Sequence, residues 1–279
     1  SITHTVGGGY TMDMELSLVE AMTEEVIKDA TERLAAVGVM DSPEYWVQHY
    51  KDVANLDGLI LNMATRIKVN LGGKSITTVA AALGVERYVL DDGWFGSRRD
   101  DRSGLGDWVV CKEKLPEGIK GLTASAREKG LKFGIWIEPE MTNSKSELFE
   151  KHPEWVIQQP HREMHKGRGG TQLVLDLSNP EVQEFVFGVV DKLMTAHPEI
   201  AYIKWDANMT LFNYGSTYLP RDKQSHLYIA YHRGLENILK RIHAKYPGLV
   251  MQACASGGGR INYGLLPYYD EFWTSDNTD

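Results

Sequence analysis

The chain has 279 residues, and its 30 lysines and arginines against 38 aspartates and glutamates give a net charge of −8. Hydrophobic residues form 42% of the sequence and charged residues 24%, which excludes a disordered chain and is typical of a globular protein. The acidic balance argues against a nucleic-acid partner, and no run of about 18 apolar residues predicts a membrane span.

The first 82 residues predict structural helices and strands, without a cluster of chemically reactive side chains. Ser17 and Glu20 fit a capping box, and apolar residues recur at helical spacing over 18–37. The apolar stretch 59–71 fits either a helix or a strand.

From residue 85 onward, short apolar runs that end in a polar side chain alternate with helical stretches. The runs, each about the length of a strand, are 85–90, 131–137, 173–175, 201–205, 249–253 and 271–275. Asn179 and Pro180 predict the start of a helix over 181–196, and 222–246 predicts a long amphipathic helix. This alternation predicts an α/β fold with a parallel sheet buried on both faces.

The polar side chains follow the carboxyl ends of several different strands. A barrel gathers all its strand ends around one mouth, whereas an open doubly wound sheet places its site at one switch point. The distribution therefore favours a (β/α)8 barrel of the TIM type.

Two charged residues at the end of the 201–205 run form the first candidate site. Lys204 and Asp206 are two positions apart, so they point to the same face of a strand. A cation keeps a neighbouring carboxylate ionised, and an ionised carboxylate at a barrel mouth can act as a nucleophile. A structural ion pair between the two residues is the alternative.

Aspartates follow two other predicted strands. Asp276 comes after the aromatic pair 272–273, and an apolar wall raises a carboxyl pKa as a general acid requires; a turn or helix N-cap is the alternative. Asp91 and Asp92 are adjacent carboxylates that can hold sugar hydroxyls. A metal ion is the other option, although no histidine lies near them in the sequence.

The segment 254–260, CASGGGR, predicts a glycine-rich loop between a strand and a helix. Its backbone N–H groups could bind phosphate, but it lacks the G-x-x-x-x-G-K-[ST] pattern of nucleotide-binding loops. Cys254 has no nearby base in the sequence, which favours a packed wall residue over a thiol nucleophile.

Five segments together resemble the α-galactosidases of glycoside hydrolase family 36, over about residues 83–279. They are VLDDGWF at 89–95, FGIWIEPEM at 133–141, YIKWD at 202–206, CASGGGR at 254–260 and WTSDNTD at 273–279. Each segment alone is a weak signal. Their shared order and the 70 positions between Asp206 and Asp276 make the combined pattern specific.

The resemblance implies a retaining double displacement on α-linked galactose, with Asp206 as nucleophile and Asp276 as general acid/base, about 5–5.5 Å apart. It implies a small-molecule α-galactoside as the partner and neither a metal nor an organic cofactor. It also implies a set of sugar-binding residues: Asp91 and Asp92 at the O4 and O6 hydroxyls, Trp136 as an aromatic wall, Lys204 and Arg168 as cationic donors, and Cys254 and Gly257 near the 2-hydroxyl.

The sequence departs from the family pattern in three ways. The chain has no room for the β-sandwich domain that precedes the barrel, it stops after the sixth expected strand, and residues 1–82 contain no recognisable tryptophan-bearing first strand. In the family register, 173–175 lies in an elaborated loop. We expect 1–279 to form a single barrel domain, with 83–279 as its catalytic portion. Residues 1–82 would pack onto or complete the barrel, as a fused, permuted or designed segment, or else exposed sheet edges would drive homo-oligomer formation.

Other functions stay open at this point. A rebuilt scaffold could impair activity, leaving a non-catalytic or structural chimeric barrel with a galactoside site. An α-N-acetylgalactosaminidase or a galactosyl-transferring relative is the second alternative, and the space around Cys254 and Gly257 would decide it. The two cysteines, Cys111 and Cys254, predict no disulfide framework and favour the cytoplasm, with the periplasm as the alternative.

Overall fold

The computed structural model describes Lys28, Glu32 and residues 76–82, 84–210 and 214–275. The predicted elements at 18–37 and 59–71 lie outside these residues, except that Lys28 and Glu32 are both helical and form an i,i+4 ion pair. Asp276 also lies outside them. The described residues belong to two compact units, of which the second, 89–123 with 132–275, contains the other predicted site residues.

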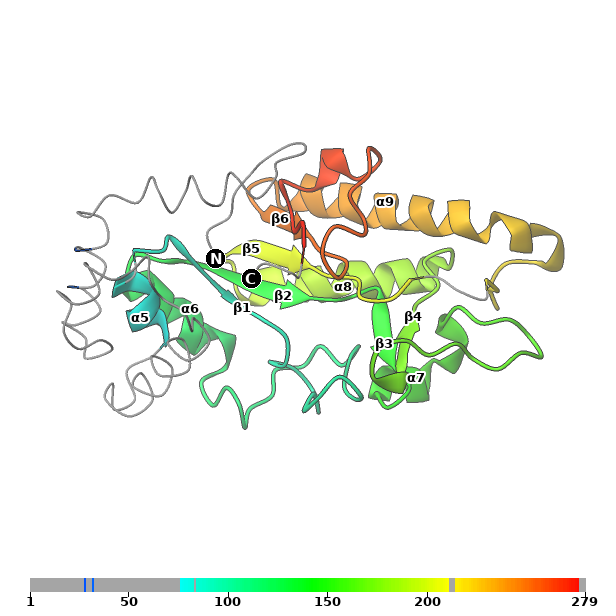
Figure 1. Cartoon of the computed structure of the whole chain (residues 1–279), viewed down its shortest axis with the longest axis horizontal. Coiled ribbons are helices and arrows are strands. Elements are labelled where there is room, and N and C mark those ends of the chain that lie inside the picture. Colours follow the sequence, from blue (N-terminus) through cyan, green and yellow to red (C-terminus); the bar gives the residue numbers. More distant parts are fainter. Residues whose placement is uncertain (1–27, 29–31, 33–75, 83, 211–213, 276–279) are drawn as a thin grey trace. The chain divides into compact units, whose positions relative to one another are not determined.

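Five strands form the central sheet in the order β1-β2-β5-β6-β7 (Figure 1). The strands are β1 (Arg87–Leu90), β2 (Lys132–Ile137), β5 (Ile200–Trp205), β6 (Val250–Ala253) and β7 (Glu271–Phe272). The pairs β2–β5, β5–β6 and β6–β7 are parallel, which confirms the predicted α/β fold with a parallel sheet. The described strands form an open sheet, so the predicted closed barrel is not present in the part of the chain that the structure describes.

A separate antiparallel pair lies in the insertion between β2 and β5. It consists of β3 (Met141–Asn143) and β4 (Gln172–Val174), so the predicted run at 173–175 does not join the central sheet. This placement agrees with the loop position that the family register implies. The insertion also contains α7 (Glu147–Lys151) and the 3-10 helices η2 (Pro153–Trp155) and η3 (Arg168–Gly170).

The helix predicted before β5 is confirmed as α8 (Pro180–Ala196). Asn179 caps it by accepting the backbone N–H of Glu181 at 2.9 Å, and proline occupies the first turn, where no backbone donor is needed. Two further helices, α5 (Ile76–Ala82) and α6 (Gly118–Glu128), precede it in the chain.

The helix predicted over 222–246 begins later than expected. Residues Arg221–His226 form the 3-10 helix η4, and the α-helix α9 covers Leu227–Lys245. The polar run 221–226 contributes no buried residue, whereas Leu227 is the first side chain that packs into the core. The α-helix therefore starts where its apolar face starts.

The helices α8 and α9 contact each other (Figure 1). Each helix has fully buried aliphatic side chains: Val182, Val186 and Val190 on α8, and Leu235, Ile238 and Ile242 on α9. Gly234 of α9 lies against the backbone carbonyl of Leu177, where a Cβ atom would collide. None of the described helices has the length and apolar character to cross a membrane.

The glycine-rich loop does not lead into a helix as predicted. Only the three-residue 3-10 helix η5 (Leu266–Tyr268) lies between the loop and β7. Gly264 and Pro267 interrupt this stretch, and both residue types are poor in helix interiors. The last predicted strand is also shorter than expected, because β7 ends at Phe272.

Candidate active site

The ends of β2, β5 and β6 bring the candidate site together. Their register pairs Ile137 with Trp205 and Trp205 with Ala253, so the residues that follow lie in one row at the carboxyl edge of the sheet. That row contains Glu138, Asp206 and Cys254. Parallel strands therefore gather three ionisable side chains from distant parts of the sequence at the place where α/β barrels carry their active sites.

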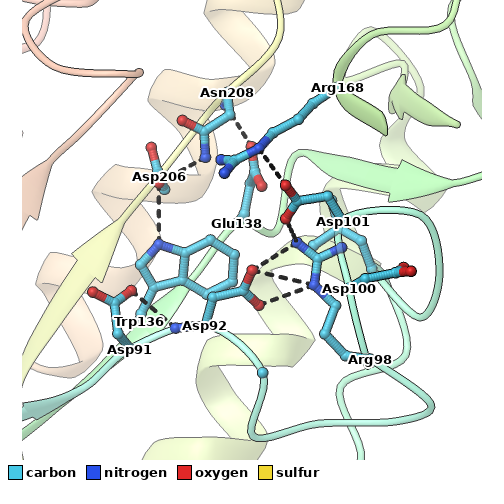
Figure 2. A network of polar contacts seen from close by, with 12 residues as sticks. Asp91, Asp92, Arg98, Asp100, Asp101, Trp136, Glu138, Arg168, Asp206 and Asn208 are labelled. Carbon is cyan, nitrogen blue, oxygen red and sulfur yellow. Dashed lines mark hydrogen bonds and ion pairs between the residues drawn. The ribbon is translucent and has the colours of Figure 1, made fainter. Parts of the chain in front are cut away.

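Asp206 is buried, with 6% of its surface exposed. Its backbone N–H donates to the carbonyl of Ile137 at 2.8 Å, which ties the tip of β5 to β2. Its Oδ2 accepts hydrogen bonds from Trp136 Nε1 at 3.1 Å and from Asn208 Nδ2 at 2.7 Å (Figure 2). These donors hold the carboxylate in a single orientation.

Two contacts hold Trp136, one to its indole and one to its backbone. It is 3% exposed and stacks on Phe95, with ring planes 2° apart and centroids 6.2 Å apart. Its backbone carbonyl accepts the indole N–H of Trp94 at 2.9 Å. The motif residues at the ends of β1 and β2 thus build one aromatic support beside Asp206.

Lys204 pairs with Asp91 rather than with Asp206. Its Nζ lies 3.4 Å from Oδ2 of Asp91 and 5.1 Å from the ring centroid of Trp273. The Asp91 side chain is 65% exposed, so this ion pair lies at the open side of the site. The structural Lys204–Asp206 pair that the sequence allowed is not what the structure shows.

Asp92 begins a chain of alternating charges that ends at Arg168 (Figure 2). Arg98 contacts Asp92 through Nη2 at 2.6 Å and Nε at 3.0 Å, and its Nη2 lies 3.4 Å from Asp101. Arg168 then donates Nε to the other oxygen of Asp101 at 2.9 Å. The structure therefore connects the two predicted site residues Asp92 and Arg168, which are 76 positions apart, through a pair that the sequence reasoning missed.

Arg98 is 5% exposed, and its remaining donors also have partners. Nη1 donates to Oδ1 of Asn143 at 3.2 Å, and the same oxygen accepts the backbone N–H of Leu105 at 2.9 Å. The Asn143 amide nitrogen reaches Thr171 Oγ1 at 3.1 Å, next to the loop of Arg168. The only local signal for this role was the position of Arg98 in the loop that follows Asp92.

Glu138 and Asn208 were also missed as site residues, although Glu138 lies within the motif at 133–141 and Asn208 lies two positions after the motif at 202–206. Glu138 is 2% exposed and accepts hydrogen bonds from Gln172 Nε2 at 2.8 Å and from the backbone N–H of Asn208. Burial, and then the charge of Asp206, raise the pKa of Glu138 to about 8. At neutral pH this carboxyl group is therefore mostly protonated.

The glycine-rich loop contributes Cys254 and Ser256 to the site. Cys254 is 4% exposed, and burial followed by the charge of Asp206 raises its pKa to about 12, which disfavours a thiolate nucleophile. Ser256 donates its backbone N–H and its hydroxyl to Oδ1 of Asn208, at 3.1 and 2.8 Å. Two donors that a phosphate would need are thus already used. Gly257 is buried with φ +88°, a conformation that favours glycine.

An ion pair between Glu140 and Arg260 holds the end of the glycine-rich loop 254–260. Glu140 is fully buried and accepts Arg260 Nη1 at 2.5 Å, Trp205 Nε1 at 2.7 Å and the hydroxyl of Tyr231 at 2.5 Å. Trp205 immediately precedes Asp206. The pair therefore links the glycine-rich loop to the strand that presents the candidate nucleophile.

The alternative of a metal at Asp91 and Asp92 receives no support from the geometry. Within residues 84–210 and 214–275, no group of three or more histidine, cysteine, aspartate or glutamate side chains is arranged to hold a metal ion. Asp92 is instead neutralised by Arg98.

Glycoside hydrolases act through a pair of carboxyl groups, and the buried carboxylate of Asp206 beside charged side chains fits one member of such a pair. The profile of the family described as Melibiase matches residues 68–279, and the chain belongs to this family. The resemblance to glycoside hydrolase family 36 is thereby confirmed, and the matched region begins somewhat earlier than residue 83.

Relatives with curated functions are named α-galactosidases. The α-galactosidase AgaA of Geobacillus stearothermophilus is 43% identical over 205 residues, which cover 74% of this chain and 28% of that protein. Alpha-galactosidase 1 of Pediococcus pentosaceus is 42% identical over 206 residues, with the same coverage of each chain. This chain thus spans little more than a quarter of the length of these relatives.

Solved structures give the same result. The crystal structure of AgaA superimposes with a TM-score of 0.70 at 43% identity, covering 73% of this chain and 28% of AgaA. The α-galactosidase of Lactobacillus brevis also has a TM-score of 0.70, at 40% identity, covering 73% of this chain and 27% of its own.

Proposed function

We propose that this chain carries the nucleophile side of a retaining α-galactosidase, which cleaves terminal α-linked galactose. The observation that carries the proposal is the buried carboxylate of Asp206 at the end of β5, oriented by Trp136 and Asn208. Relatives at 42–43% identity over this part of the chain are α-galactosidases.

In the first step, Asp206 attacks the anomeric carbon from the face opposite the leaving group and forms a covalent galactosyl–enzyme. Asp276 donates a proton to the departing glycosidic oxygen. In the second step, Asp276 removes a proton from water, the water oxygen attacks the same carbon, and Asp206 leaves as a carboxylate. Two inversions return the α configuration.

The spacing of two aspartates in a relative supports this pair. AgaA was crystallised with raffinose as a variant that has one aspartate replaced by asparagine, and with stachyose as a variant that has another replaced by alanine. The two positions are 70 apart in AgaA, the same separation as Asp206 and Asp276. Replacing a catalytic carboxylate allows an uncleaved oligosaccharide to stay bound, so we infer oligosaccharides of this class as substrates.

The remaining site residues would hold the sugar. Asp91 and Asp92 would accept hydrogen bonds from the O4 and O6 hydroxyls, which selects galactose through its axial O4. Two cations lie beside these carboxylates. Lys204 pairs directly with Asp91, and Arg168 pairs with Asp101. Trp136 would form the wall beside the ring, with Cys254 and Gly257 near the 2-hydroxyl.

We further propose that the central sheet is part of a (β/α)8 barrel. Its strand order follows the chain order in one direction, without the reversal that defines a doubly wound sheet.

The direct test is hydrolysis of an aryl α-galactoside by the purified chain and by Asp206→Ala and Asp276→Ala. We expect each variant to lose at least about 1,000-fold in kcat, because each removes a group needed in the chemical step. Asp222→Ala, at an exposed position in η4, is the matched control and should keep the parent rate.

Added azide distinguishes the two roles. In the nucleophile variant, azide should attack from the β face and yield β-galactosyl azide. In the acid/base variant, azide should attack the covalent intermediate and yield α-galactosyl azide. Equal products from both variants, or activity that survives both substitutions, would overturn the assignment.

A further inference from the structure

Glu138 is a buried carboxylic acid next to the candidate nucleophile, and the reaction described above does not use it. It follows β2 as Asp206 follows β5, and the register of the two strands places the residues side by side. A buried carboxyl group with a raised pKa beside a second buried carboxyl group is typical of functional sites.

The contacts of Glu138 lead to Asp206 through one residue. Its carboxyl oxygen accepts the backbone N–H of Asn208, and the side chain of Asn208 turns back to donate Nδ2 to Asp206 Oδ2 at 2.7 Å (Figure 2). Glu138 therefore fixes where the backbone of residue 208 lies, and residue 208 fixes the Asp206 carboxylate.

Two further contacts make this arrangement rigid. Gln172 of β4 donates to the same Glu138 oxygen at 2.8 Å. Ser256 donates twice to Oδ1 of Asn208, which leaves only the amide nitrogen to face Asp206. The side chain of Asn208 thus has one orientation that satisfies both of its ends.

We propose that Glu138 is a positioning residue, which holds Asn208 and through it keeps the Asp206 carboxylate in the orientation needed for attack on the sugar. This inference rests on the proposed function of Asp206 as nucleophile. Glu138 itself does not touch the substrate.

The charge state of Glu138 is part of its action. Burial is the largest effect on the pKa of Glu138 and favours the neutral acid. The charge of Asp206 also opposes ionisation, whereas the charge of Arg98 favours it. A neutral Glu138 still accepts both N–H groups and leaves Asp206 as the charged member of the two. Above about pH 8 a second carboxylate appears beside the first and repels it.

The test compares Glu138→Gln, which keeps a neutral acceptor of the same shape, with Glu138→Met, which removes the acceptor. Glu163→Gln, at an exposed loop position, is the control and should behave as the parent. The substrate is 2,4-dinitrophenyl α-galactoside, whose leaving group departs without a proton. Its kcat/KM therefore reports attack by Asp206 and is independent of Asp276.

At pH 6 we expect Glu138→Met to lose about 100-fold in kcat/KM, since a displaced nucleophile reacts slowly, and Glu138→Gln to lose only about threefold. The parent should show a fall in kcat/KM above about pH 8 that is absent in Glu138→Gln. Equal losses in the two variants with an unchanged pH profile would overturn the inference and leave the proposed function intact.

Binding of 1-deoxygalactonojirimycin, which occupies a solved structure of AgaA, separates the two proposals without turnover. Its cationic nitrogen should require a correctly placed Asp206. A parent that binds it but hydrolyses nothing, with binding lost in Glu138→Met and kept in Glu138→Gln, would support the positioning role and reject the activity. A parent that neither binds nor hydrolyses would overturn both.

Discussion

The guanidinium of Arg98 donates two hydrogen bonds to the carboxylate of Asp92, from Nη2 at 2.6 Å and from Nε at 3.0 Å. Lysine cannot reproduce this forked contact, because its ammonium is a single point charge. We expect Arg98→Lys to lower kcat/KM for an aryl α-galactoside by about 30-fold through a misplaced Asp92. Steady-state kinetics on the parent and the variant measure this change.

Two comparisons separate positioning of Asp92 from a general loss of structure. The penalty of Arg98→Lys should shrink with a 4-deoxy or a 6-deoxy galactoside, whichever lacks the hydroxyl that Asp92 binds. Arg99→Lys is the neighbouring control, since Arg99 is 55% exposed and pairs with exposed Glu113. An equal penalty on every substrate would contradict the prediction.

Glu138 should make the stability of the chain depend on pH. Its folded pKa of about 8 lies above the ordinary value of 4.5, so the folded state holds a proton that the unfolded state releases. The free energy of unfolding should therefore fall as the pH rises from about 4.5 to 8, by at most about 5 kcal/mol from this group. Urea unfolding of the parent and Glu138→Gln at pH 5 and pH 8 measures it.

The difference between the two proteins carries this prediction, because other carboxylates titrate in both. Glu138→Gln should gain stability relative to the parent between pH 5 and pH 8. Glu163→Gln, at an exposed site, should track the parent. A stability difference between Glu138→Gln and the parent that is the same at both pH values would show that Glu138 is already ionised at pH 5.

Local patterns in the sequence indicated candidate carboxylates that follow strands, but they did not indicate the residues whose partners lie in distant segments. Asp91, Asp92 and Asp206 follow apolar runs, a pattern that is visible locally. Arg98 and Asn208 gain their roles from partners in space, and Asn143 meets Arg98 across 45 positions. Glu138 was visible only as a strand end, since its raised pKa comes from burial beside Asp206.

The fold divides in the same way. Short apolar runs located β2, β5 and β6 to within one residue, because each of these strands is largely buried. The amphipathic pattern placed the start of α9 too early in the chain. Some residues of 221–226 favour a helix, but none of them is buried in the core. The sheet order and the separate β3–β4 pair depend on hydrogen bonds between distant segments, which a single sequence does not show.

The Glu140–Arg260 ion pair should contribute strongly to stability. Glu140 is fully buried and Arg260 is 19% exposed, so Arg260→Met leaves an unpaired charge in the interior. We expect a loss of about 3–5 kcal/mol, measured by urea unfolding. The exposed Arg99–Glu113 pair is the matched control, and Arg99→Met should cost less than about 1 kcal/mol.

A double variant separates the effect of an unpaired charge from the effect of lost side-chain packing. Glu140→Gln with Arg260→Met removes both charges, and it should recover part of the stability that Arg260→Met alone loses. If the double variant loses more free energy of unfolding than the two single variants lose together, the charge pair is not the cause of the loss in Arg260→Met.

Two glycines in neighbouring helices should respond in opposite directions to the same substitution. Gly234 of α9 lies against the carbonyl of Leu177, and backbone cannot move aside as a flexible side chain can. Gly234→Ala should therefore lower the free energy of unfolding by about 2–3 kcal/mol, as overpacked core positions do. Gly188 of α8 has open space around it, so Gly188→Ala should stabilise the chain by up to about 1 kcal/mol through helix propensity. A loss of stability in both variants would mean that alanine is tolerated poorly in these helices for a reason other than the Leu177 contact.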